Sequence, residues 1–280
     1  MEPFNVIKAT GEEERFSISK LKKSLSNAGA QPQTIKLLIN NLDENGFFRN
    51  GITTKELYRE AYRMLKQNSH RVASRYKLKE ALLELGPSGY PFEVLISEIF
   101  TKLGYSTEVG SVVRGKCVSH EIDVIAQDES EVFMMECKFH NRKDHHCNVT
   151  IPLYVQARFQ DVSDTWAADS KLKKKKPSSY IVTNTRFTKD AMDYAECMQM
   201  KLLSWDYPQK QGLRTLIEKT HIHPVTVLSS LTKKETMKLL NKNIVHCEQL
   251  LANKSILEEL QFSHSKKTTI LKEAEDLCSD

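Results

Sequence analysis

The sequence predicts an α/β protein of several domains: a helical N-terminal segment, a mixed α/β core and a small helical C-terminal segment. Three observations indicate this. Apolar residues follow helical spacing in residues 1–85, alternation typical of strands dominates from 106 to 205, and helical spacing returns after His223. The domains are therefore expected at residues 1–85, 87–215 and 220–280.

Composition narrows the class of protein. Of the 280 residues, 40% are hydrophobic and 28% are charged, which is close to globular averages. The chain shows no charged-then-apolar leader, and no apolar run approaches the ~18 residues of a membrane span, so we expect a soluble, cytoplasmic protein. Six scattered cysteines predict reduced thiols. The net charge of +5 is compatible with a polyanionic partner but identifies none.

The N-terminal segment opens with a strand and a turn, and helices follow. We expect the strand at Phe4–Ile7, the turn at Gly11, and helices from Ser19, at Thr34–Leu42 and at Thr53–Leu65. Thr53 offers a capping hydroxyl with Glu56 three residues on, which is a plausible helix start.

Two glycines and two prolines fall within Gly86–Pro91, and this composition shift predicts a domain boundary. A helix with one apolar face follows from Phe92 and is stopped by Gly104. Thr232 is a good cap for the C-terminal helices. The core elements are expected as strands at Ser106–Val113, His120–Ala126, Glu131–Phe139, Ser179–Thr183 and Lys201–Trp205, with helices at Leu153–Asp161 and Lys189–Met198.

Two of these strands carry charges that an apolar strand does not need. In Glu131–Phe139, alternation puts Glu136 and Lys138 on one face of a strand whose two faces are both apolar. Asp123 lies inside the apolar run of the preceding strand. A buried charge is costly unless it pairs, binds a metal or does chemistry. These three residues therefore indicate a site.

An antiparallel hairpin of the two strands would bring Asp123 and Glu136 together on one face, where hard oxygen ligands suit Mg²⁺. Lys138, on the same face, would orient a metal-activated water or bind a phosphate, which indicates phosphodiester hydrolysis. The alternative is a structural ion pair between Lys138 and one acid. That alternative accounts poorly for the second acid.

The order of Asp123 followed by Glu136, Cys137 and Lys138 resembles the PD-(D/E)XK nucleases. The segments Pro91-Phe92-Glu93 and Leu103-Gly104-Tyr105 look like the opening helix of their Mrr-like restriction branch. The resemblance implies a restriction-endonuclease-like fold and Mg²⁺-dependent DNA cleavage. It assigns Glu93 as the helix-borne acid, Asp123 and Glu136 as metal ligands, and Lys138 as the catalytic lysine. Gln156 is a loose match to a downstream polar position of the family.

The N-terminal segment resembles an ATP-cone, a nucleotide-sensing domain. The resemblance lies in Val6-Ile7-Lys8, Gly11, Phe16, Lys20-Leu21 and the closing Arg71–Tyr76. It implies that Lys8 and Lys20 hold the phosphates of ATP or dATP as point charges. The alternative is that both lysines are solvated charges on a domain that has lost nucleotide binding.

The remaining features are open to more than one interpretation. The C-terminal segment resembles a helix-hairpin-helix domain, which implies DNA-backbone or partner binding, and a plain packing role is equally open. Cysteines and histidines at 117–120 and 137–147 invite a zinc interpretation, but strand geometry puts Cys137 and His140 on opposite faces. The lysine run at Lys171–Lys176 is either a DNA contact or a solvated loop.

The combined prediction is a Mg²⁺-dependent DNA endonuclease of restriction type, regulated by ATP or dATP. A homodimer is the expected assembly, since two strands need two sites. The alternative is a nucleotide-responsive DNA-binding protein with an inactive nuclease core.

Overall fold

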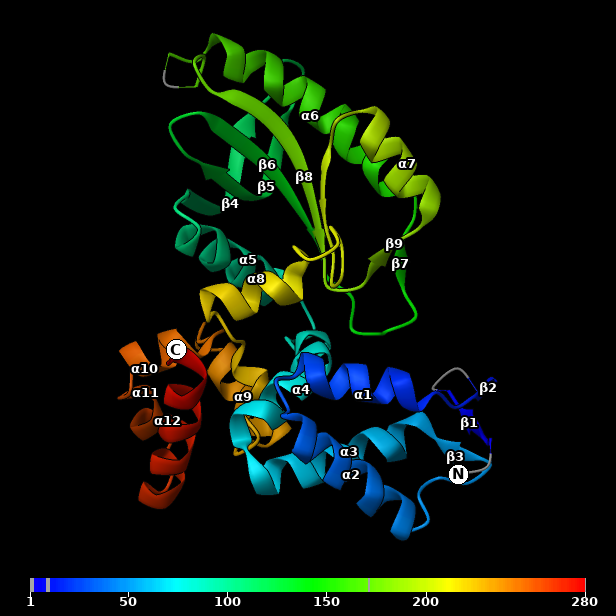
Figure 1. Ribbon diagram of the computed structural model, residues 1–280. Helices are drawn as coiled ribbons and strands as arrows, with labels where there is room; N and C mark the ends of the chain where they lie inside the picture. Colours follow the sequence, from blue (N-terminus) through cyan, green and yellow to red (C-terminus); the bar gives the residue numbers. More distant parts are fainter. Residues whose placement is uncertain (1–2, 9–10, 171, 280) are drawn as a thin grey trace. The chain divides into compact units, whose positions relative to one another are not determined.

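The computed structural model describes residues 3–8, 11–170 and 172–279, and the chain divides into two compact units. Unit 1 comprises residues 1–78 with 227–230, and unit 2 comprises residues 79–226 with 231–280 (Figure 1). The division falls inside helix α4 (His70–Leu83). The Gly86–Pro91 segment, where the sequence suggested a boundary, separates α4 from α5 (Tyr90–Lys102) within unit 2.

Unit 1 is a group of helices with a small sheet of order β2-β1-β3. β1 pairs antiparallel with β2 and parallel with β3. The cap at Thr53 is confirmed: its hydroxyl accepts the Glu56 N–H at 3.1 Å, and the Glu56 carboxylate accepts the Thr53 N–H at 2.9 Å. The elements are β1 (Asn5–Ile7), β2 (Glu13–Arg15), α1 (Ile18–Asn27), α2 (Pro32–Glu44), β3 (Ile52–Thr53) and α3 (Thr54–Asn68).

Unit 2 contains a five-stranded sheet of order β10-β8-β6-β5-β4. Strands β4, β5 and β6 form an antiparallel meander, and β6, β8 and β10 are parallel. A separate parallel pair joins β7 and β9. The strands are β4 (Ser106–Arg114), β5 (Ser119–Gln127), β6 (Glu131–Lys138), β7 (His146–Cys147), β8 (Lys176–Thr183), β9 (Arg186–Phe187) and β10 (Lys201–Leu203).

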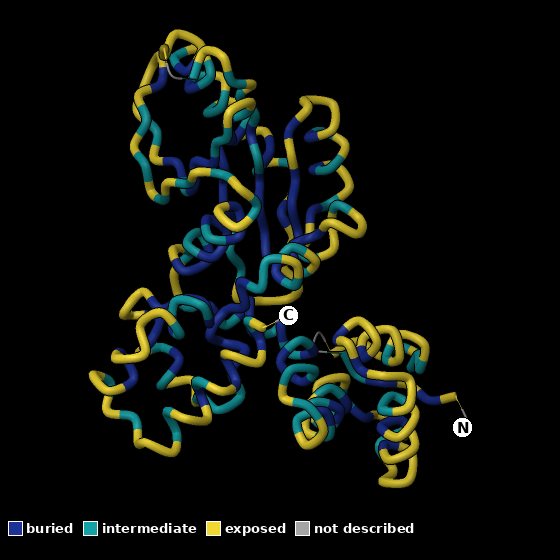
Figure 2. Tube along the Cα trace, turned by 60° about the vertical axis from the view of Figure 1, so that its left-hand side comes forward, coloured by how far each residue is buried: buried dark blue, intermediate teal, exposed yellow. Residues whose placement is uncertain are grey.

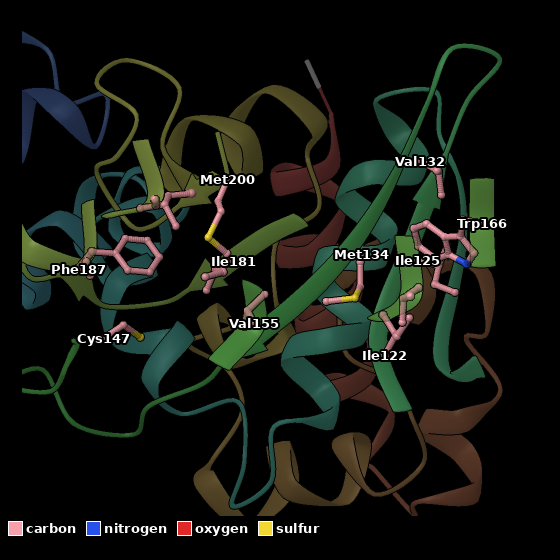
Figure 3. Packing of buried hydrophobic residues seen from close by; sticks show 14 residues of the cluster. Ile122, Ile125, Val132, Met134, Cys147, Val155, Trp166, Ile181, Phe187 and Met200 are labelled. Carbon is pink, nitrogen blue, oxygen red and sulfur yellow. The ribbon is translucent and has the colours of Figure 1, made fainter. Parts of the chain in front are cut away.

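Helices cover both faces of this sheet (Figure 1). α6 (Thr150–Ala168), several residues longer than predicted, and α7 (Lys189–Cys197) pack on one face, and α5 lies on the other with α8 (Leu213–Thr220) beside it. The central strand β6 is buried along most of its length, whereas the edge strand β4 has no buried residue (Figure 2). Figure 3 shows the core under α6, where Val132, Met134 and Ile181 meet Val155 and Trp166. Burial of this apolar surface is the main stabilising contribution.

The C-terminal part of unit 2 is helical, as predicted. Thr232 caps its first helix, α9, and accepts the Glu235 N–H at 3.4 Å. An ion pair of 2.6 Å between Lys102 of α5 and Glu248 of α10 ties this part to the core. None of the described helices is long and apolar enough to cross a membrane. The helices are α9 (Lys233–Leu240), α10 (Cys247–Ala252), α11 (Ile256–Glu259) and α12 (His264–Cys278), preceded by a 3-10 turn at Val225–Val227.

A buried asparagine fixes the chain where it leaves β6. Asn184, fully buried after β8, accepts the His140 N–H at 2.9 Å and donates to the His140 carbonyl at 2.6 Å. Its amide also donates to the Leu82 carbonyl of α4 at 3.3 Å. One side chain therefore holds β6, β8 and the end of α4 in fixed positions.

Replacing Asn184 with alanine should lower the free energy of unfolding by about 2–3 kcal/mol, because the part-buried backbone groups of His140 and the buried carbonyl of Leu82 lose their partner. Urea unfolding followed by circular dichroism measures the change. Asn148→Ala is the control, since the side chain of the exposed Asn148 accepts the Thr150 N–H at 3.1 Å at the surface, and its cost should stay below about 0.5 kcal/mol. Equal losses in the two variants would contradict this role of Asn184.

Candidate active site

The predicted antiparallel hairpin is confirmed and places the two strand acids side by side. Val124 of β5 pairs with Met135 of β6. Continuing that register by one residue puts Asp123 opposite Glu136, and opposed residues project from the same face of a sheet. The Cys137 N–H of β6 donates to Asp123 Oδ2 at 2.7 Å, which fixes the aspartate against the neighbouring strand.

Glu136 is buried, with 5% of its surface exposed, and both of its oxygens are engaged. Lys138 Nζ donates to Oε1 at 2.5 Å. The guanidinium of Arg158, on α6, donates to Oε2 and also to the carbonyl of Glu121. The Arg158 side chain is itself 12% exposed, so this is a buried ion pair in which each charge depends on the other.

Arg158 was not predicted as a site residue, although the spacing of apolar residues in its helix points to it. Its helix carries buried apolar residues at Val155 and Val162, three positions before and four positions after it. That spacing puts Arg158 on the apolar side of α6. A charge in an apolar helix stripe is the same anomaly that identified Glu136 in an apolar strand.

Glu93 approaches this group from the first turn of α5. Burial raises the pKa of Glu93 to about 7, and the negative charges of Asp123, Glu121 and Glu136 add to the effect. Burial likewise raises the pKa of Asp123 to about 6, with a further contribution from Glu136 and an opposing one from the Cys137 N–H. Crowded carboxylates in a partly buried site therefore resist ionisation.

Lys138 adds a positive charge beside these carboxylates. Burial lowers its pKa, but the hydrogen bond and the charge of Glu136 raise it more, so the net shift is upward. Glu93, Asp123 and Glu136 thus face two cations, Lys138 and Arg158. Within the described residues, no three His, Cys, Asp or Glu side chains are already arranged as a metal-binding group. The arrangement combines oxygen ligands, a lysine and an arginine at one end of a sheet.

Two other predicted features are Gln156 and the lysine run. Gln156 lies on α6, where its buried Oε1 accepts no hydrogen bond within the described part of the chain. The lysine run is at the opposite end of the sheet, since Lys176 pairs with Glu131 at the start of β6 while Lys138 pairs with Thr183. Seven residues of strand span roughly 23 Å. Lys171 lies outside the described residues.

Of the cysteines and histidines considered for zinc, His120 pairs with an acid outside the set, whereas His140 lies against Cys147, another member of the set. His120 Nε2 lies 2.8 Å from Asp161 Oδ2 of α6. His140 Nε2 lies 3.5 Å from the sulfur of Cys147. The Cys137 side chain is buried, and burial, then the charge of Asp123, raises the pKa of its thiol well above the ordinary range.

In unit 1, the two lysines predicted to bind phosphates converge on one carboxylate. Lys8 Nζ lies 2.7 Å and Lys20 Nζ lies 2.6 Å from the oxygens of Glu14. Hydrogen bonds from Lys20 and Lys8 lower the pKa of Glu14 to about 2. The structure therefore brings both lysines together around an anionic group that belongs to the chain itself.

Without divalent cations, Asp123→Asn should raise the melting temperature at pH 8. Because the folded-state pKa is raised from 3.8 to about 6, the ionised acid destabilises the fold progressively as pH rises through that range. Removing the charge should recover about 1 kcal/mol, after allowance for solvent screening, or roughly 2–4 °C. Differential scanning fluorimetry in chelator measures the shift, which should shrink as pH is lowered toward 5.

Asp128→Asn is the matched control with the opposite sign. The N–H groups of Glu131 and Ser130 lower the pKa of Asp128, so its ionised form is stabilising at pH 8 and its loss should lower the melting temperature. A decrease for Asp123→Asn at pH 8 would show that Asp123 is not in a repulsive acidic site.

Comparisons with known proteins identify the family to which the chain belongs. Residues 86–208 match the model of the restriction endonuclease family, and residues 223–278 match the model described as AF1548-like, C-terminal. An uncharacterized protein of Archaeoglobus fulgidus is 32% identical over 180 residues, which cover 64% of this chain and 97% of the relative. The crystal structure of AF1548, a protein of unknown function, matches with a TM-score of 0.56 at 30% identity, over 68% of this chain and 98% of that chain. The chain therefore belongs to the family of these AF1548-like proteins and carries a restriction endonuclease domain before an AF1548-like C-terminal domain.

Proposed function

We propose that this protein is a Mg²⁺-dependent DNA endonuclease of restriction type that hydrolyses phosphodiester bonds. The observation that carries the proposal is the meeting of Glu93, Asp123, Glu136 and Lys138 at one end of the sheet, in a domain that matches the restriction endonuclease family. A homodimer would supply one such site for each DNA strand.

Asp123 and Glu136 would hold the metal ion. Their type and charge fit a hard divalent cation, because the repulsion that raises the pKa of Asp123 is the repulsion that such a cation relieves. Asp123 has committed Oδ2 to the Cys137 N–H, and Glu136 would exchange one of its two cationic partners for the metal. When bound, Mg²⁺ lowers the pKa of a water molecule and stabilises charge on the phosphate.

Lys138 and Glu93 would act on either side of these two acids. Lys138 Nζ would orient the attacking water or bind a phosphate oxygen, and the hydrogen bond from Lys138 to Glu136 holds the ammonium in position for it. Glu93, with a pKa of about 7, would add a third carboxylate to the site from α5. Arg158 would be a positioning residue that sets the orientation of Glu136.

Wild-type protein should nick supercoiled plasmid with Mg²⁺ and not with chelator. Asp123→Ala, Glu136→Ala and Lys138→Ala should each lower the cleavage rate by about 100-fold or more, because each removes charge stabilisation at the reacting phosphate. Agarose gels of a time course measure the rate. Lys174→Ala, at the far end of the sheet, is the control and should cleave at the wild-type rate. Cleavage by all three site variants would refute the site.

We also propose that unit 1 binds ATP or dATP and regulates cleavage. Lys8 and Lys20 already converge on Glu14, which shows that their ammonium groups reach a common anion. A nucleotide phosphate would take the place of the Glu14 carboxylate. Binding without hydrolysis is expected, since the chain has no glycine-rich phosphate loop with its following lysine.

Lys8→Ala and Lys20→Ala should each weaken ATP and dATP binding about 10-fold or more, because each removes a charged phosphate contact. Isothermal titration calorimetry measures the affinity. Lys55→Ala removes an exposed lysine of α3 and should bind as the wild type does. Unchanged affinity in all three variants would place the nucleotide elsewhere, and no binding by wild type would make the Lys8–Glu14–Lys20 group purely structural.

The second candidate is a nucleotide-responsive DNA-binding protein with an inactive nuclease core. One observation favours it: both oxygens of Glu136 are occupied by Lys138 and Arg158, which compete with a metal ion. DNA binding that responds to ATP, with no cleavage at any Mg²⁺ or Mn²⁺ concentration, would favour this candidate. Cleavage by Arg158→Ala but not by wild type would identify Arg158 as the residue that closes the site.

A further inference from the structure

The loop that follows β6 is a fixed surface beside the candidate active site. At its start, Asn184 holds both backbone groups of His140, at 2.9 Å and 2.6 Å. At its end, His146 of β7 is paired with Arg186 of β9. The loop is therefore fastened at both ends to the segment that follows β8.

Positive charge collects along this loop. Burial lowers the pKa of Lys79, and the charges of Arg186 and Lys143 lower it further, against an opposing effect of Asp206. The Lys79 ammonium also lies 5.8 Å from the centre of the Trp205 ring. Lys79, Lys143 and Arg186 thus lie within electrostatic reach of one another. We call these three residues the basic patch.

The basic patch lies near the chain that leaves the candidate active site. Burial lowers the pKa of His140, and His145, Lys138 and His146 add to this effect, so His140 is within electrostatic reach of Lys138 and its charged form is disfavoured. Two acids lie nearby, and each is paired with an arginine: Asp144 with Arg142 and Asp206 with Arg186, both at 2.7 Å. The cations of the patch therefore gather near the loop that follows Lys138, and His140 adds no charge to them.

Clustered basic side chains attract a polyanion, even where one of them also pairs with a neighbouring acid, as Arg186 does with Asp206. A row of such charges leading from a phosphodiester site has the chemistry of a DNA-backbone contact. The lysine run offers a second cationic surface, but it is at the opposite end of the parallel strands. The two surfaces predict different paths for DNA across the sheet.

We infer that the basic patch holds the phosphates of the DNA strand that flanks the scissile bond, so that the duplex leaves the site across β7 and β9 and not along the lysine run. The inference rests on the proposed function in one respect, that DNA is the substrate. It adds the residues that hold the DNA and the direction in which it runs.

Binding of a fluorescein-labelled duplex, measured by anisotropy in chelator over a range of salt concentrations, tests the inference without cleavage. Lys143→Gln/Arg186→Gln should weaken binding about 10- to 100-fold at low salt and reduce the slope of log affinity against log salt by about 2, one for each lost phosphate contact. Lys173→Gln/Lys174→Gln, which removes two exposed charges from the lysine run, is the matched control and should behave as wild type.

All four substituted residues are exposed, so matched melting temperatures should show that both proteins fold. Equal weakening by the two double variants, no weakening by the patch variant, or no DNA binding by wild type would overturn the inference. Plasmid cleavage by the same proteins separates the two proposals. If the patch variant binds and cleaves DNA normally, the inference about the basic patch is wrong and the proposed nuclease function stands. If wild type binds DNA through the patch but cleaves none, the proposed nuclease function is wrong and the DNA-binding surface stands.

Discussion

The register of the β5–β6 hairpin is the constraint on which the candidate site depends. Asp123 and Glu136 share a face only because Val124 pairs with Met135, and a slip of one residue would send the two acids to opposite faces. The apolar neighbours fix that register, since Met134 must enter the core under α6. Packing of uncharged residues therefore sets the geometry of the charged ones.

Most of the core could be predicted from the sequence, because buried strands show a regular alternation of apolar residues and a charged residue within such a strand is easy to recognise. The five strands of the large sheet and the convergence of Asp123 with Glu136 follow from alternation and from the cost of burying charge. The strands β2 and β3 could not be predicted, since β2 consists of three charged residues without alternation and β3 has only two residues. Arg158 was missed because its partner lies 22 residues away, and helical spacing alone names no partner.

The lysines of unit 1 show a different limit of sequence analysis. Lys8 and Lys20 could be selected by resemblance, but the sequence did not show that Glu14 lies between them. Pairing between a strand and the start of a helix depends on how the chain turns, which has no periodic signature. In both units, the charges were visible in the sequence and their partners were not.

The double engagement of Glu136 has a thermodynamic consequence for the proposed nuclease. If a metal ion takes the place of Lys138 or Arg158 on the carboxylate, the displaced cation needs a new anion, which a DNA phosphate would supply. Metal affinity and DNA affinity are then linked functions of one exchange equilibrium, so each ligand strengthens the binding of the other by the same factor. Such a site would discriminate against metal alone and would assemble in full only when the substrate is present.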